Sequence, residues 1–439
     1  MRNRIPLTLL LMLGLPSQIV WAQATDFIIP GTSGRGFGIP DKQTFDDRIE
    51  EAPWDAGAIH LAPWIGIRDA TNVASTNVGT GTADDDDFTL TAGAGLRAYL
   101  RSGPRVVWAA HALPEYTWWA NDDNRRRFNG RYGVGGFFYL NRLELEISQR
   151  LVEEQQFFSS EVQRLTPNSR AISRAVLDLH LARSLWLSVN GERIRRRNKE
   201  DGNAVLASLD RTEEDYSARL DFRSPRGWEV GIGYHAGSFD FARGARDLSS
   251  DSDGLVFDAL FTGNRFAGLL QLRQRRLEPK PGSELPASDE TTGVLQTVWE
   301  IAERSALLTY YRRALGFSVS DGASFFVAER AGARWQAGLG DRLNLSLYAE
   351  IGEDQFEARG TSGLVRLDDV TSFGGDLEFS LRAEIGLRLQ VQRSEFDSSD
   401  PAFDRDVTTF GIALQLRPIE KLSRKISERL RLGSAAGVW

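Results

Sequence analysis

The sequence of 439 residues contains no cysteine, two methionines, four histidines and five lysines. Without cysteine the chain has no disulfide, no thiolate metal site and no cysteine nucleophile. The histidines, at positions 60, 111, 180 and 235, lie far apart in the sequence, which disfavours a multi-histidine metal site. No segment approaches 18 uninterrupted apolar residues, so the sequence predicts no transmembrane helix.

Signatures of catalysis are missing as well. The chain has neither a G-x-S-x-G nucleophile elbow nor an H-E-x-x-H helix, and we predict no enzyme, no cofactor and no metal site. His180 and His235 share a strand face with Asp178 and Glu229, and we interpret both as polar lining. A catalytic set assembled only in space is the alternative. The run of aspartates at 84–87 offers oxygen ligands to a hard cation, but consecutive carboxylates lack the spacing of a cation loop, which favours a solvated loop.

Residues 1–22 have the pattern of a signal peptide. Arg2 and Arg4 precede an apolar stretch from Ile5 to Leu15, and Ala22 and Ala24 supply small residues for cleavage. An N-terminal membrane anchor is the alternative, and the short apolar stretch argues against it. The pattern predicts export from the cytoplasm.

From residue 59 onward, apolar and polar side chains alternate in segments of about ten residues. In residues 88–101 the even positions are Phe, Leu and Ala, whereas the odd positions are Thr, Gly, Arg and Tyr. Residues 343–351 and 385–392 show the same alternation. A period of two indicates β-strands with one apolar and one polar face.

Two kinds of connection separate these segments in alternation. The short kind carries an arginine, and these arginines recur every 37 to 43 residues, at positions 105, 142, 183, 226, 265, 304, 342 and 382. The long kind is mostly acidic and includes residues 70–87, 198–215, 243–253, 277–290 and 394–406. Eight short turns separate nine hairpins, which predicts 18 strands.

Short turns at one end and long loops at the other are typical of a transmembrane β-barrel. We therefore predict an all-β fold: an antiparallel up-and-down barrel of about 18 strands over residues 59–416, in the bacterial outer membrane, with both termini in the periplasm. A barrel is closed because an open sheet edge would leave backbone groups unpaired in lipid. A secreted β-sandwich or propeller is the alternative, but neither has a reason to separate short from long connections.

Two segments lie outside the predicted barrel. Residues 23–58 contain several glycines and Pro40, and we expect an irregular lead-in that lies in the periplasm or in the lumen. Residues 417–439 contain a predicted amphipathic helix from Ile419 to Leu432 with a narrow apolar stripe. This helix would plug the barrel mouth, lie on the inner leaflet or dock on a partner, and a loose solvated tail is the alternative.

The polar face of the strands is predicted to line the lumen. Its charged residues have both signs, which suits a hydrated path for a polar molecule, or an internally ion-paired wall, better than a single-sign selectivity ring. The predicted lumen residues are Arg97, Arg101, Glu144, Glu146, Arg174, Asp178, Glu192, Arg219, Asp221, Arg223, Glu229, Arg273, Arg275, Glu350, Asp376, Glu378 and Arg388.

The last predicted strand carries a further signal. Thr409, Gly411, Leu414 and Leu416 give the order polar, x, glycine, x, x, apolar, x, apolar, where x is any residue. This order resembles the terminal motif that the barrel assembly machinery recognises in outer-membrane proteins. Here, however, the chain continues to Trp439.

The whole arrangement resembles the outer-membrane β-barrel porins encoded with exopolysaccharide-biosynthesis and exosortase clusters. The resemblance covers most of residues 55–416 and rests on Leu61–Asp69, on strands such as Gly95–Leu100, and on the even strand pattern. It implies a conduit that assists export of a polysaccharide substrate together with periplasmic export proteins. Outer-membrane lipid, lipopolysaccharide and the barrel assembly machinery are the other expected partners, and nucleic acid is not one. A general porin for small solutes and a structural or adhesive surface barrel are the alternatives.

Overall fold

The computed structural model describes residues 39–40, 42–76, 87–156, 161, 166–199, 204–242, 247–320, 322–340, 342–360, 363–382 and 385–416. The signal peptide and the C-terminal helix predicted from the sequence lie outside these residues, as do residues 23–38 and 41 of the predicted lead-in. The elements are α1 (Lys42–Glu50), β1 (Trp54–Ala56), β2 (Ile59–Thr76), β3 (Asp87–Arg101), β4 (Val106–Trp119), η3 (Asp123–Arg125), β5 (Arg127–Tyr139), β6 (Leu143–Gln156), β7 (Thr166–Ala182), β8 (Leu185–Asn198), α2 (Ala204–Ala207), β9 (Arg211–Arg223), β10 (Trp228–Phe241), β11 (Ser250–Thr262), β12 (Phe266–Pro279), β13 (Ser288–Ala302), β14 (Ser305–Phe317), β15 (Ala323–Leu339), β16 (Leu343–Ala358), β17 (Leu364–Arg382), β18 (Ile385–Ser398), η4 (Pro401–Phe403) and β19 (Arg405–Leu416).

The strands β2 to β19 form one closed antiparallel barrel. Each pairs with its neighbours in sequence, and β19 pairs back with β2, with Leu416 opposite Ile65. The short strand β1 pairs only with the start of β2. The prediction of an all-β barrel with 18 strands is confirmed.

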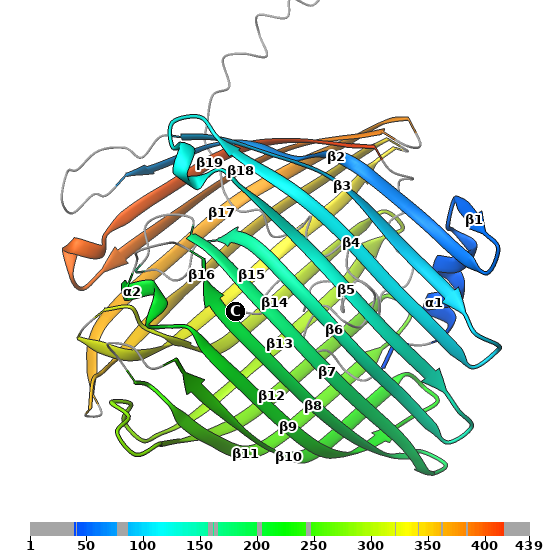
Figure 1. Cartoon of the computed structure of the whole chain (residues 1–439), viewed down its shortest axis with the longest axis horizontal. Helices are drawn as coiled ribbons and strands as arrows, with labels where there is room; N and C mark the ends of the chain where they lie inside the picture. The colour runs from blue at the N-terminus through cyan, green and yellow to red at the C-terminus, as the bar shows by residue number, and fades with distance from the viewer. Residues whose placement is uncertain are drawn as a thin grey trace, which may run out of the picture.

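The two ends of the barrel differ (Figure 1). At one end, called here the turn end, each hairpin closes within a few residues, and an arginine lies in or beside the turn. The backbone carbonyls of Arg142, Arg265, Arg304 and Arg342 each accept a hydrogen bond from the neighbouring strand. At the opposite end, called here the loop end, the connections are longer and include α2, η3 and η4.

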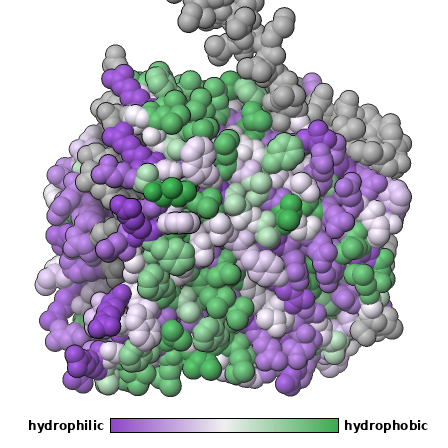
Figure 2. Space-filling view, turned by 180° about the vertical axis from the view of Figure 1, so that it is seen from behind, coloured by the Kyte–Doolittle hydropathy of each residue, from purple (hydrophilic) through white to green (hydrophobic). Residues whose placement is uncertain are grey.

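The outer face of the barrel is apolar and exposed. Ile232, Ile351 and Trp299 are 61%, 62% and 55% exposed, and apolar side chains gather across the middle of the molecule between polar margins (Figure 2). Such a band fits lipid hydrocarbon, and aromatic rings near its edges suit the headgroup boundary. The fold is that of a transmembrane β-barrel. Among the described residues, no helix has the length and apolar character needed to cross a membrane.

The expectation of an irregular lead-in is wrong for residues 42–50, which form α1. Phe45 and Ile49 are four residues apart, so both point from one side of the helix, and both are buried. They pack against Tyr99, Val107 and Phe137. A nine-residue helix is marginal in water, and its contact with the barrel supplies the stability that its sequence lacks.

Gly227, in the turn between β9 and β10, provides a test of the turn geometry. Its φ is +85°, and a Cβ at this position would overlap the carbonyl oxygen of Thr262 in β11. We expect Gly227→Ala to destabilise the barrel by about 1–3 kcal/mol, measured as a lower midpoint of heat unfolding in detergent. Gly322→Ala is the control, because nothing lies within 4 Å of its Cβ position. Equal midpoints for the two variants would contradict the assigned geometry.

Candidate functional site

The predicted lumen residues occupy the inward positions of their strands. Along β3, for example, Arg97 is 6% exposed, whereas its outward neighbour Leu96 is 39% exposed. The same alternation places Glu146, Asp178 and His235 inward, each with 0% exposure. The role of these residues as a working surface stays a prediction.

Many of the inward charges pair with one another along the wall. Arg223 lies 2.7 Å from Asp178 and 3.3 Å from Glu229. Arg219 contacts Asp221 at 2.5 Å and also pairs with Asp258. The wall is therefore a network of alternating signs, and a polar solute would meet both donors and acceptors along it.

The same pairing recurs around the rest of the barrel. Further ion pairs join Arg174 to Glu146 at 3.9 Å, Arg273 and Arg275 to Asp215 at 2.9 and 3.5 Å, and Arg388 to both Asp376 and Glu378 at 3.8 Å. Glu350 accepts a hydrogen bond from Tyr310 at 2.6 Å, and Arg101 contacts Asp46 of α1 at 2.6 Å. Glu144 and Glu192 also occupy inward positions, opposite Asp178 and Arg174 on β7.

His111 lies in a part of the wall that also carries Arg97, Arg131 and Arg150. It is opposite Arg97 on β3 and Gly133 on β5, and Gly133 in turn is opposite Arg150 on β6. Gly133 has no side chain, and the imidazole and the Arg150 chain occupy the space that a Cβ would need. The glycine thus lets the imidazole and the Arg150 side chain lie flat against the wall.

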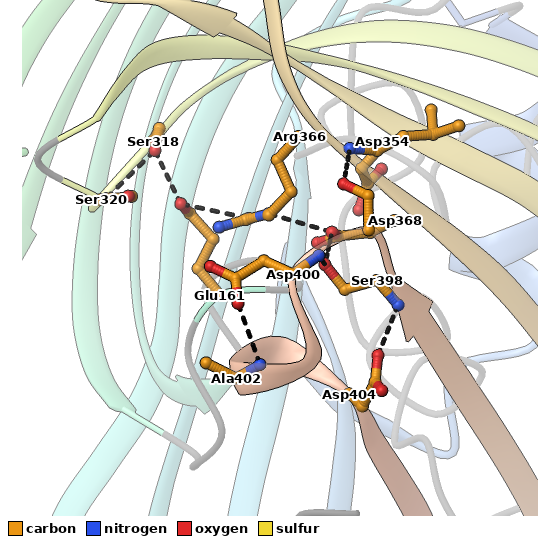
Figure 3. A network of polar contacts seen from close by, with 12 residues as sticks. Glu161, Ser318, Ser320, Asp354, Arg366, Asp368, Ser398, Asp400, Ala402 and Asp404 are labelled. Carbon is orange, nitrogen blue, oxygen red and sulfur yellow. Dashed lines mark hydrogen bonds and ion pairs between the residues drawn. The ribbon is translucent and has the colours of Figure 1, made fainter. Parts of the chain in front are cut away.

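Sequence reasoning missed Glu161, which makes a long-range contact near the loop end. Glu161 follows β6 in the sequence, but its carboxylate accepts a hydrogen bond from the Ser318 hydroxyl at 2.7 Å (Figure 3). It also accepts a hydrogen bond from the Val319 backbone amide at 2.7 Å. It also lies 3.3 Å from Arg366 at the start of β17. Ser318 and Val319 directly follow β14, and Arg366 lies on β17; each of these strands is seven or eight positions from β6 and β7 by the shorter way round the 18-strand barrel. Glu161 therefore contacts the opposite wall.

Arg366 holds this junction in place. Its guanidinium lies 3.6 Å from the ring centroid of Phe356 and 3.8 Å from that of Phe403. Its Nε donates to Asp368 at 2.9 Å, and Asp368 also accepts from Ser398 at 2.5 Å. A cation held between two rings and two carboxylates has little freedom to move. We call Glu161, Ser318, Val319, Arg366 and Asp368 the Glu161 junction.

A cluster of apolar side chains beside the Glu161 junction also reaches over the lumen. The ring of Phe317, at the end of β14, is 5.2 Å from that of Phe239 and 4.8 Å from that of Phe241, both on the inner face of β10. The two strands are four positions apart, or roughly 19 Å along the wall. The end of β14 therefore leans over the lumen. Leu209, Leu248, Leu277, Leu285, Phe325 and Val327 complete this buried apolar cluster.

The turn end is narrowed by α1. The ring centroids of Phe45 and Phe137 lie 4.4 Å apart, and the Tyr139 hydroxyl donates to the carbonyl of Pro40 at 2.6 Å. Arg101 pairs with Asp46 on the same helix. The lumen is thus narrowed at both ends, and its polar wall lies between the two constrictions.

The Glu161 junction is expected to respond to pH. Burial raises the pKa of the Glu161 carboxyl, and the Ser318 hydroxyl, the Val319 amide and Arg366 offset this only in part. A carboxyl that binds its proton more tightly in the contact than outside it favours the contact at low pH, and this contribution is lost as pH rises through the raised pKa. Acidification from neutral pH toward 4.5, the ordinary pKa of a glutamate carboxyl, should therefore stabilise the Glu161 junction across the lumen. We expect single-channel conductance to fall as a result.

The measurement is conductance across this pH range. Glu161→Gln stays neutral and should remove the dependence, whereas Glu278→Gln, at a carboxylate whose side chain is 65% exposed, should retain it. A wild-type conductance that rises on acidification would contradict the assignment.

Other predicted sites have simple outcomes. β19 contains Thr409, Gly411, Leu414 and Leu416, but their recognition by the assembly machinery stays a prediction. Asp87, the last of the aspartate run and the one described, accepts a hydrogen bond from the Asn121 amide at 3.1 Å. No group of three or more His, Asp and Glu within the described part of the chain is arranged to hold a metal.

The comparisons with known proteins bear on the fold of the chain. No family model and no curated protein matches this sequence. Among solved structures, the chain is similar to the outer-membrane protein OpdK from Pseudomonas aeruginosa, with 13% identity, TM-score 0.47, and coverage of 81% of this chain and 98% of that one. It is also similar to a BenF-like porin from Pseudomonas fluorescens Pf-5, with 11% identity and TM-score 0.49, and to OccK2 (OpdF) from P. aeruginosa in complex with glucuronate, with 12% identity and TM-score 0.48. Both share the same 81% and 98% coverage. None of these concerns exopolysaccharide or exosortase clusters, so the finer part of that resemblance gains no support.

Proposed function

We propose that this protein is a passive channel for small polar solutes across the bacterial outer membrane. The observation that carries the proposal is a closed 18-strand barrel whose outer face is apolar and whose inner face carries paired charges of both signs. A barrel of this strand number is wide enough for an aqueous passage. We assign the turn end to the periplasm and the loop end to the cell exterior, as in barrels of this type, which places both chain ends in the periplasm.

The constrictions favour small solutes over a polymer. A polysaccharide in transit must occupy the whole length of the lumen at once, including the level of α1 and that of the Glu161 junction. A small solute passes each constriction separately and exchanges hydrogen bonds with the wall as it moves. For this reason the small-solute alternative replaces the conduit expected from the sequence.

The test is reconstitution of the purified full chain. In planar bilayers we expect discrete steps of ohmic conductance, and in proteoliposomes we expect uptake of monosaccharide-sized solutes with exclusion of a dextran. Heat-denatured protein is the matched control. Absence of conductance from folded protein, or uptake of the dextran equal to that of the monosaccharide, would overturn the proposal.

A further inference from the structure

One strand carries a column of cations on its outer face. Arg193, Arg195 and Arg197 of β8 and the following Lys199 occupy alternate positions, and all four are exposed. Because alternate residues of a strand share a face, their side chains project in one line from the barrel surface. We call these four residues the β8 cation column.

The column starts where the apolar surface ends. Toward the turn end, the outward residues of β8 include Leu185 and Val189, which are 37% and 39% exposed. Gly191 follows and lies opposite Tyr216 of β9, an exposed outward tyrosine of the kind that marks the headgroup boundary. Arg193 is the next outward position. The column therefore rises through the level of lipid headgroups on the loop side of the membrane.

Two of its members form no direct ion pair in the described structure, although the charge of Arg197 is felt by the Asp210 carboxylate. Arg193 lies 3.3 Å from Glu214, and Lys199 lies 2.7 Å from Glu153. Arg195 is opposite Ala171 on β7 and Thr212 on β9, and Arg197 is opposite Ser169. Within the described ranges, no carboxylate forms an ion pair with either arginine.

The neighbouring outer surface carries more acidic than basic residues, although Lys280 pairs with Asp240 and Asp251 there. At the loop end, β10, β11 and β13 present Asp240, Asp251, Asp253 and Asp289 at outward positions. The whole chain also carries a net charge of −7. Acidic residues already make the outer surface at the loop end soluble, so solubility does not explain four cations on one strand. The β8 cation column is therefore a local feature.

We propose that the β8 cation column binds the phosphate groups of a phosphorylated lipid headgroup in the outer leaflet, the lipid A part of lipopolysaccharide. Guanidinium groups match phosphate oxygens in two-point contacts, and cations near an anionic membrane surface attract headgroups. The inference goes beyond transport and rests on the orientation assigned under the proposed function, in which the loop end faces the exterior.

The experiment uses the full chain purified in detergent and titrated with bisphosphorylated lipid A, with the bound lipid counted by native mass spectrometry. The double variant Arg195→Gln/Arg197→Gln should weaken binding by about 30-fold, which is two contacts of about 1 kcal/mol each. Arg276→Gln is the matched control, since this arginine lies on the outer face of β12 with its side chain 61% exposed but pairs with Glu278. It should bind as the wild type does.

Three further arms identify the ligand chemistry. Lipid A stripped of its phosphates should bind about as weakly as the double variant binds the intact lipid. EDTA, which removes divalent cations, should leave lipid A binding by the wild type unchanged. If binding is lost in EDTA, divalent cations bridge the lipid to the acidic residues of the rim, and the proposal is overturned. Displacement by equimolar inorganic phosphate would assign the site to the free anion and overturn the lipid assignment.

Equal binding by the double variant and the wild type would also overturn the proposal. Conductance of the double variant separates this question from the channel function. Both arginines point away from the lumen, so conductance should equal that of the wild type whether or not the lipid is bound.

Discussion

Replacing Phe45 by alanine is expected to release α1 and to raise single-channel conductance several-fold. Phe45 is fully buried, and its ring packs against Phe137 of the inner wall. Truncation of a buried phenylalanine costs about 3–5 kcal/mol. A nine-residue helix has no comparable reserve of its own stability, so the helix should leave the wall rather than tolerate the cavity.

The absence of native cysteine makes the release directly measurable. Val107, in the same cluster, is 0% exposed, and a cysteine placed there should react with a thiol reagent only when α1 has left. We expect slow labelling of Val107→Cys alone and fast labelling when it is combined with Phe45→Ala. Glu50→Ala, at an exposed position of the same helix, should change neither labelling nor conductance. Fast labelling without a change in conductance would show that α1 does not obstruct the path.

The barrel itself was predictable because a membrane wall imposes a period of two. Lipid on one side and a polar lumen on the other force alternation in every strand, and the arginine-marked turns fix the strand number. Where the outer face leaves the lipid, this constraint disappears. The structure therefore extends β9 back to Arg211 and β11 back to Ser250, in stretches that the sequence alone assigned to loops.

The constrictions were not predictable in the same way. Glu161 is one acidic residue in a polar connection, and nothing near it in the sequence indicates partners 157 residues away. α1 was hidden for a different reason, since its two buried residues give too weak a pattern to distinguish a helix from the glycine-containing segment before it. The inward charges were read from strand parity, but their pairing depends on strand register, which parity does not specify.

The largest effect at the loop end is expected from Arg366→Gln. This change removes the cation from between Phe356 and Phe403 and leaves the buried carboxylates of Glu161 and Asp368 without it. Breaking a buried ion pair from one side costs about 3–5 kcal/mol, because the remaining charge is left uncompensated. We expect the Glu161 junction to open, with a several-fold rise in conductance.

Two further substitutions separate charge from geometry. Arg366→Lys keeps the positive charge but loses the planar group that stacks on the rings and reaches two carboxylates, so an intermediate conductance is expected. Arg393→Gln, at a cation 44% exposed near the same end, is the control and should conduct as the wild type does. A thiol reagent should label Val319→Cys faster in the Arg366→Gln background, because the Val319 amide contacts the Glu161 carboxylate. If Arg366→Gln conducts as the wild type does while this labelling accelerates, the junction opens without limiting the current, and the constriction that governs passage is then the one formed by α1.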